Sequence, residues 1–287
     1  MEKINLVVKT KKKIKKLGLA LGGGGARGLS LIGVIRAFEE NNITFDYVAG
    51  TSVGALIGAF YCAGLSSKQM EEIARNTKES DIKTNLIPFM PSKTEGLERI
   101  IKNNLGDIDI LDLKTPFCAV AVDVLKGEEV HLTKGNLAKA VAGSCAVPAV
   151  FNPVEFGDYL LFDGGLQNTI PSNVPKLQGC ERTIAVDINS SRGSGAKSTK
   201  YVDLMMASIG IMMKSNAIKG YLNADLMIAP DLKRFSSKKF AGIDEMIEEG
   251  YKSAMEVMPE LLELIKKKNK KSFIKRIFRI KSKSKWN

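Results

Sequence analysis

The 287-residue sequence contains little cysteine, proline and histidine, and it has no long apolar run. Its four cysteines lie far apart, with no CxxC pair and no spacing typical of metal ligands. We therefore expect a reducing compartment, no disulfide framework and no metal site. No apolar run approaches the roughly 20 residues of a membrane-spanning helix, and no signal-peptide pattern follows the basic N-terminus. These absences favour a cytoplasmic protein, unless it is exported by a route without such signals.

The net formal charge of +12 is unevenly distributed along the chain. Residues 1–16 carry +6 and residues 266–287 carry +11, which leaves −5 for residues 17–265. If the protein binds an acidic partner, we therefore expect the two ends of the chain to form the binding surface. We predict a basic N-terminal segment (1–16), one catalytic α/β domain (17–265) and a basic amphipathic C-terminal tail (266–287).

Apolar segments alternate with turns in an order that predicts a parallel sheet. Residues 16–21 and 43–49 are predicted as buried strands, and residues 29–41 and 55–63 as the helices that follow them. The order of strand, glycine-rich turn, helix, strand, sharp turn and helix is typical of a parallel sheet covered by helices. Further strands are predicted at 117–124, 128–133, 159–162, 182–188 and 226–229, and further helices at 66–76, 95–105, 137–143, 202–217 and from 243, the last kinked or divided at Pro259.

A glycine-rich turn separates the first predicted strand from the first helix. Residues 23–28 (GGGARG) match the GxGxxG pattern of dinucleotide sites. Such a site also needs an acid at the end of the second strand, whereas Asp46 lies inside that strand. Converging glycine N–H groups at a helix N-terminus also suit a developing oxyanion. The loop alone does not distinguish a phosphate cradle from an oxyanion hole.

The second predicted strand ends in Gly50-Thr51-Ser52-Val53-Gly54, which matches GxSxG. Glycines at both ends allow the strained turn that exposes a nucleophilic serine at a strand end. Serine also caps helix N-termini, so an ordinary structural role is the alternative. The position between a buried strand and a small-residue helix favours Ser52 as the nucleophile.

A nucleophilic serine needs a base, and the single histidine does not suit that role. His131 alternates with apolar neighbours in a short predicted strand, so we interpret it as an ordinary strand residue. Asp163 follows a short apolar strand and precedes two glycines that permit a tight turn. It is the first candidate for the base, with Asp123 and Asp187 at other strand ends as rivals.

Together, GGGARG, GTSVG and DGG, in this order and without a catalytic histidine, resemble the patatin-like phospholipases. The segments SCAVP (144–148) and NPV (152–154) strengthen the resemblance, which covers residues 17–187. It implies a three-layer α/β/α fold with a mostly parallel central sheet. It also implies hydrolysis of phospholipid or lysophospholipid esters by a Ser–Asp dyad, without a cofactor.

By this resemblance, Ser52 attacks the ester carbonyl and Asp163 accepts its proton. Water activated by Asp163 would then release the fatty acid from the acyl-enzyme. A partly desolvated aspartate, with a raised pKa, suits this role. The oxyanion hole would be formed by Gly23, Gly24, Gly25 and Arg27, while the remaining motif glycines are Gly28, Gly50, Gly54, Gly164 and Gly165.

The C-terminal tail predicts contact with a membrane. In residues 272–286, phenylalanine and isoleucine recur at helical spacing between lysines and arginines. Such a segment suits the interface of an anionic membrane, on the inner face if the protein is cytoplasmic. The alternative is a cationic tail that stays in solvent. A nucleic-acid partner is less suitable, because the phenylalanines and isoleucines on one face of the segment fit lipid better than bases.

Three other functions fit parts of the same pattern. An acyltransferase on this scaffold would pass the acyl group to a thiol or alcohol. A nucleotide-binding protein would use residues 23–28 for phosphate. A membrane-binding scaffold without catalytic activity would turn over no ester.

Overall fold

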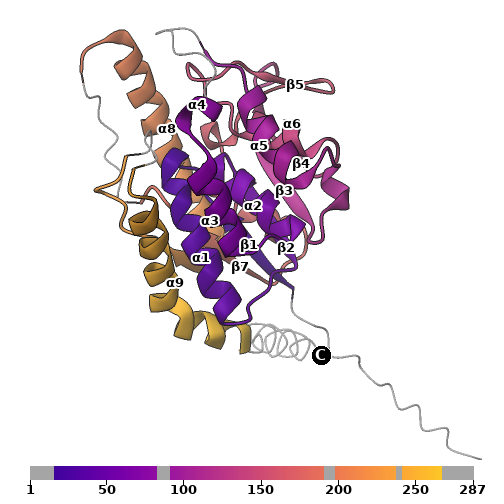
Figure 1. Ribbon diagram of the computed structural model, residues 1–287, viewed down its shortest axis with the longest axis vertical. Helices are drawn as coiled ribbons and strands as arrows, with labels where there is room; N and C mark the ends of the chain where they lie inside the picture. Colours follow the sequence, from indigo (N-terminus) through magenta and orange to yellow (C-terminus); the bar gives the residue numbers. More distant parts are fainter. Residues whose placement is uncertain (1–15, 83–90, 191–197, 237–240, 267–287) are drawn as a thin grey trace, which may run out of the picture.

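The computed structural model describes residues 16–82, 91–190, 198–236 and 241–266. Within these ranges, one eight-stranded sheet has the order β5-β6-β3-β2-β1-β7-β8, and β4 also pairs with β3 (Figure 1). The strands are β1 (Leu17–Leu21), β2 (Tyr47–Thr51), β3 (Phe117–Asp123), β4 (Glu128–Leu132), β5 (Val154–Phe156), β6 (Tyr159–Asp163), β7 (Arg182–Val186) and β8 (Leu226–Ile228).

The centre of the sheet is parallel and one side is antiparallel. The parallel part consists of the neighbouring strands β3, β2, β1, β7 and β8. Strands β4 and β6 each pair antiparallel with β3, and β5 pairs antiparallel with β6. Parallel strands need crossover helices, which here cover the faces of the sheet. The predicted α/β fold with a mostly parallel central sheet is confirmed.

Helices cover both faces of the sheet. The larger core packs the sheet against α1 (Leu29–Glu40), α2 (Val53–Ala63), α6 (Leu137–Ser144) and α9 (Ile243–Lys266). The other face packs against α7 (Asn173–Leu177) and α8 (Tyr201–Asn223). The remaining helices are α3 (Ser67–Asn76), α4 (Glu79–Ile82), α5 (Glu95–Leu105) and the short 3-10 turns η1 (Gly25–Gly28), η2 (Ile110–Asp112) and η3 (Gly164–Leu166).

Two predicted elements differ from the structure, and one strand was missed. The second strand begins at Tyr47 rather than at residue 43: Ile43 and Phe45 are buried, but the Ile43 amide donates to Phe38 at the end of α1. Strand β5 was not predicted, because three residues carry too short a pattern. Pro259 does not divide the last helix, which runs continuously through it.

The predicted domain boundaries stay predictions. β1 begins at Leu17 and α9 ends at Lys266, while most of both predicted basic ends lies outside the described residues. Among the helices of the described ranges, none combines the length and hydropathy needed to span a bilayer.

The first and last helices cross at two glycines. A Cβ on Gly33 of α1 would lie 1.8 Å from the Ile247 carbonyl oxygen, and a Cβ on Gly250 of α9 would lie 1.8 Å from that of Ser30. Figure 1 shows α9 lying alongside α1. The helices therefore pack backbone against backbone at this crossing.

We expect Gly33→Ala to destabilise the fold by about 1–3 kcal/mol, because the methyl group forces the helices apart. Urea unfolding measures the change. Glu256→Ala, at an exposed position of α9, is the control and should change the free energy of unfolding by less than about 0.5 kcal/mol. Equal effects of the two substitutions would contradict the close crossing.

Candidate active site

Ser52 occupies the turn between β2 and α2 in a conformation that few non-glycine residues adopt. Its φ and ψ are 57° and −128°. Two glycines make this turn possible: a Cβ on Gly50 would lie 2.3 Å from the Gly54 carbonyl oxygen, and one on Gly54 would lie 2.2 Å from that of Leu21. Such strain persists where the surroundings enforce it, and it is concentrated at functional sites.

A buried serine on α6 holds the turn from the other side. The Ser144 hydroxyl accepts a hydrogen bond from the Ser52 amide at 2.9 Å and donates one to the Val120 carbonyl at 2.6 Å. It therefore ties the Ser52 turn to β3. Sequence reasoning quoted Ser144 within SCAVP but gave it no role, because only the fold brings α6 to this turn.

Asp163 lies at the end of β6 and is almost fully buried. Its Oδ1 accepts from the Gly165 amide at 2.8 Å, and its own amide donates to Ala146 at 2.9 Å. A Cβ on Gly164 would lie 2.2 Å from the Val120 carbonyl oxygen, so glycine lets this turn sit against β3. Burial raises the pKa of Asp163 to about 6, and the Ser52 hydroxyl and the Gly165 amide oppose the rise.

The sheet brings Ser52 and Asp163 together across β3. Thr51 is in register with Val120 on β3, and Asp163 is in register with the next residue, Ala121. Ser52 lies close enough to lower the pKa of the carboxyl. Within the described ranges, the buried Oδ2 of Asp163 has no hydrogen-bond partner of normal geometry and is an available acceptor beside that hydroxyl.

Cys145 is a third side chain beside Ser52 and Asp163, and the sequence did not predict its place there. Burial raises the pKa of its thiol, the Asp163 carboxylate adds to the rise, and the Ser52 hydroxyl opposes it. The thiol is therefore neutral and borders the pair as a small, weakly polar group.

The glycine-rich loop lies directly against Ser52. A Cβ on Gly23 would lie 3.1 Å from the Ser52 Cβ. The Gly23 amide donates to the Thr169 carbonyl at 3.0 Å, so this N–H group is already used by the fold. Gly25 begins η1, which continues into α1, and the first N–H groups of such a turn have no intrahelical acceptor.

The Arg27 side chain makes a structural contact with a distant segment of the chain. Its guanidinium donates to the Phe235 carbonyl through Nε at 3.1 Å and Nη2 at 2.9 Å. We therefore assign no oxyanion role to its side chain. Gly28 allows the start of α1 to approach α2, because a Cβ there would lie 2.1 Å from Val53 Cγ2.

The other candidate acids hold loops. Asp123 accepts from the amides of Leu125 and Leu160 at 3.2 and 3.3 Å. Asp187 accepts from the Asn189 amide and from the Tyr221 hydroxyl, both at 2.8 Å.

His131 lies on β4, as predicted, in a polar cluster. Its Nε2 contacts Glu129 at 2.7 Å, and Glu129 also binds Lys219 and Asn168. Among the described residues, the hydrogen-bond partner of His131 is Glu129, and His131 bonds to neither Ser52 nor Asp163.

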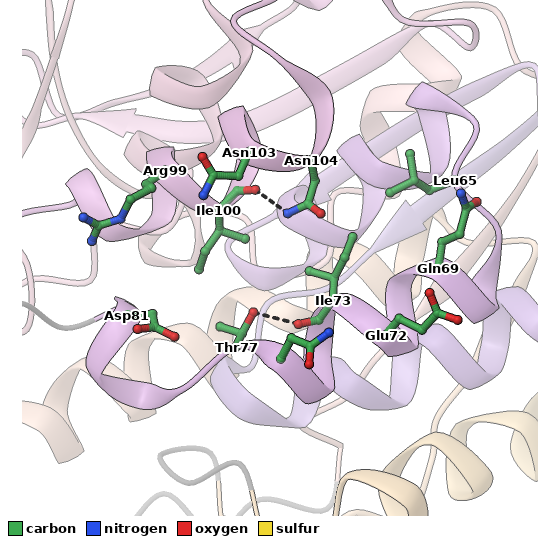
Figure 2. Close-up of a pocket in the computed structure, with 11 residues that line it drawn as sticks. Leu65, Gln69, Glu72, Ile73, Thr77, Asp81, Arg99, Ile100, Asn103 and Asn104 are labelled. Atoms are coloured by element: carbon green, nitrogen blue, oxygen red, sulfur yellow. Dashed lines mark hydrogen bonds between the residues drawn. The ribbon is translucent and has the colours of Figure 1, made fainter.

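Two of the hollows on the described surface are lined by neither Ser52 nor Asp163. The larger, about 580 Å³, lies between α3, α4 and α5 (Figure 2). Two of its polar side chains bond to their own helices, Thr77 to Ile73 and Asn104 to Ile100. The smaller, about 310 Å³ and mostly apolar, lies between α8 and the carboxyl ends of the strands, where Asn189 binds the Gly23 carbonyl.

A family model for patatin-like phospholipases matches residues 19–174, which include the glycine loop, the Ser52 turn and Asp163. The chain belongs to this family. The resemblance found in the sequence is thereby confirmed.

Named relatives support the assignment over different lengths. An uncharacterized NTE family protein of Mycobacterium tuberculosis is 31% identical over 221 residues, covering 72% of this chain and 60% of that protein. Neuropathy target esterase of Drosophila melanogaster is 33% identical over 184 residues, covering 61% of this chain and 13% of that protein. The match thus spans less than two thirds of the length of each of these relatives.

A solved structure shows the same fold. VipD from Legionella pneumophila aligns over 86% of this chain and 67% of its own, with a TM-score of 0.51 and 14% sequence identity. The chain therefore has the patatin-like α/β fold.

We expect Asp163→Asn to stabilise the protein at pH 8. The folded-state pKa of about 6 lies above the ordinary 3.8, so the folded state binds the proton more tightly, and stability falls as pH rises between these values. Removing the buried charge should raise the free energy of unfolding by on the order of 2 kcal/mol at pH 8. The gain should disappear near pH 4, where the carboxyl is protonated in the folded state.

Urea unfolding at the two pH values measures this difference. Asp123→Asn is the matched control, since Asp123 is equally buried but accepts two backbone N–H groups. It should give no comparable gain at pH 8. A destabilised Asp163→Asn at pH 8 would contradict the cost assigned to the buried charge.

Proposed function

We propose that the chain is a serine acyl hydrolase that cleaves fatty-acyl esters of phospholipids or lysophospholipids through Ser52 and Asp163. The observation that carries this proposal is a serine in a strained strand-to-helix turn beside a buried carboxyl group. Membership of the patatin-like phospholipase family supports a lipid ester as the substrate.

Asp163 is suited to act as the base in place of histidine. Burial raises the pKa of its carboxyl to about 6, closer to neutrality than that of an ordinary aspartate. At neutral pH the ionised carboxylate takes the proton of Ser52 as Oγ attacks the ester carbonyl. Protonated Asp163 then gives that proton to the leaving alcohol, and the acyl-enzyme remains.

Water completes the cycle by the same steps in reverse. Asp163 removes a proton from water, the hydroxide attacks the acyl carbonyl, and the fatty acid leaves as Ser52 regains its proton. The roles of acid and base thus alternate on one carboxyl group.

We assign the oxyanion hole to the amides of Gly24 and Gly25. Gly23 is excluded as a donor because its amide is bonded to Thr169. Gly24 has no room for a side chain, since a Cβ would lie 2.6 Å from Ile188 Cδ1. At the start of the η1–α1 segment, these N–H groups favour a developing negative charge.

The dinucleotide alternative has less support. The glycine loop lies against Ser52, and Asp46, the acid expected to bind a ribose, accepts from the Leu17 amide at 2.7 Å. The loop and the acid are thus engaged in other contacts.

We expect a fluorophosphonate probe to label the wild type and not Ser52→Ala, because the probe reacts with an activated serine hydroxyl. Phospholipid and lysophospholipid hydrolysis should fall by at least about a hundred-fold in Ser52→Ala and in Asp163→Asn. Mass spectrometry of released fatty acid measures turnover.

The controls separate chemistry from folding. Asp187→Asn changes a carboxyl at another strand end, outside the proposed pair, and should retain labelling. Ser144→Ala should fold and reduce turnover less than Ser52→Ala, because it removes the hydrogen bonds to the Ser52 amide and the Val120 carbonyl but keeps the serine hydroxyl of residue 52. Labelling that survives in Ser52→Ala would overturn the proposed nucleophile.

We also propose that the basic C-terminal tail, outside the described residues, attaches the protein to anionic membranes. Deleting residues 266–287 should weaken binding to anionic vesicles strongly, since each basic residue contributes about 1 kcal/mol near such a surface. Turnover of a soluble ester should stay unchanged. Vesicle sedimentation measures binding, and unchanged binding would contradict the proposal.

A further inference from the structure

Helix α8 exposes an apolar stripe along its length. Tyr201, Leu204, Ile211, Ile218 and Leu222 recur at intervals of three, four or seven residues, so they share one helix face. All five are exposed, Tyr201 and Leu222 by 73% and 79%. Helices of globular proteins ordinarily turn such residues toward the core. We call these five residues and the two serines between them, Ser208 and Ser215, the α8 stripe.

The two serines do not make the α8 stripe polar. The Ser208 hydroxyl donates to the Leu204 carbonyl at 2.9 Å, and that of Ser215 donates to Ile211 at 3.1 Å. Both hydroxyls are therefore bonded back to their own helix. The stripe can leave water without leaving these donors unsatisfied.

The same helix lies on the turn that carries Asp163. The Met213 carbonyl accepts from the Thr169 hydroxyl at 2.7 Å, and a Cβ on Gly165 would lie 2.2 Å from Met213 Cε. Met213 and Ala217 also line the apolar hollow of about 310 Å³ beside the glycine loop. One face of α8 thus covers the candidate site, the α8 stripe lies on the exposed face of the same helix, and α8 lies at the upper left of Figure 1.

We propose that the α8 stripe docks on the surface of an anionic lipid bilayer and so brings the candidate site to its substrate. This inference rests on the proposed function for the substrate class. Lys200 precedes α8 and Lys214 flanks the stripe, and both are exposed, whereas the one acid of α8, Asp203, is half-buried and bonded to the Ser198 hydroxyl. An apolar face with cations at its edge is the arrangement of helices that lie in a membrane interface.

The other occupants fit less well. A second copy of the chain would bury the stripe against protein and cover the hollow beside the site. The protein's own basic tail would bring its lysines and arginines toward Lys200 and Lys214. An anionic bilayer instead complements these cations and accepts the apolar side chains.

The test compares two sets of substitutions in the full chain. The stripe triple is Leu204→Gln, Ile211→Gln and Leu222→Gln, none of which lines the hollow. The control triple is Leu111→Gln, Leu125→Gln and Leu177→Gln, three leucines elsewhere in the fold whose exposure of 69–72% falls within the range of the stripe triple. Sedimentation with phosphatidylcholine vesicles, with and without phosphatidylglycerol, measures partition, and a soluble short-chain ester measures turnover.

We expect the stripe triple to lower partition by at least about ten-fold, because three apolar side chains no longer enter the bilayer. The loss should persist in high salt, which screens contacts of the tail but not apolar burial. The control triple should bind as the wild type does. Turnover of the soluble ester should match the wild type in both triples.

Equal partition of the two triples would overturn the inference. A stripe triple that converts a dimer to a monomer in sedimentation equilibrium, with partition unchanged, would show that a second copy covers the stripe. A loss seen only when residues 267–287 are present would show that the tail covers it. Since partition requires no turnover, an inactive wild type would count against the proposed function and leave this test intact.

Discussion

At Gly54 a single β-carbon would come within 2.2 Å of the Leu21 carbonyl oxygen, and at Gly164 within 2.2 Å of that of Val120. The candidate site depends on this absence of side chains, because three turns converge at the centre of the sheet. The turn after β1 lies on the Ser52 turn, and the turn after β6 lies on β3. The motif glycines thus provide the space in which backbone approaches backbone.

A second constraint is electrostatic. Burial raises the pKa of Asp163 to about 6, which suits the proposed role as a base near neutral pH, and the same burial makes its ionised form unfavourable. The Gly165 amide offsets part of that cost. A site of this kind carries a local instability that the large core supported by α1, α2, α6 and α9 has to outweigh.

The sequence was sufficient for the order of the longer strands and helices, since apolar periodicity and glycine turns are local signals, but the short elements α4, β5 and α7 were missed. It also led to Ser52 and Asp163 as candidates, because GxSxG and DGG follow predicted strands. It did not reveal Ser144, Cys145 or the bond from Gly23 to Thr169, which arise from register and packing between distant segments. Nor did it show that several apolar residues of α8 are exposed to solvent, because the composition of a helix does not tell which of its faces packs against the rest of the protein.

The crossing of α1 and α9 has a consequence for synthesis. Helix α1 begins immediately after the glycine loop, yet its partner is the last helix described, more than two hundred residues later in the chain. The guanidinium of Arg27 likewise gains its acceptor, the Phe235 carbonyl, only after that later segment has been synthesised. While the chain is still on the ribosome, α1 therefore lacks the helix that later packs against it, and its exposed apolar face stays uncovered until the segment that forms α9 has been synthesised.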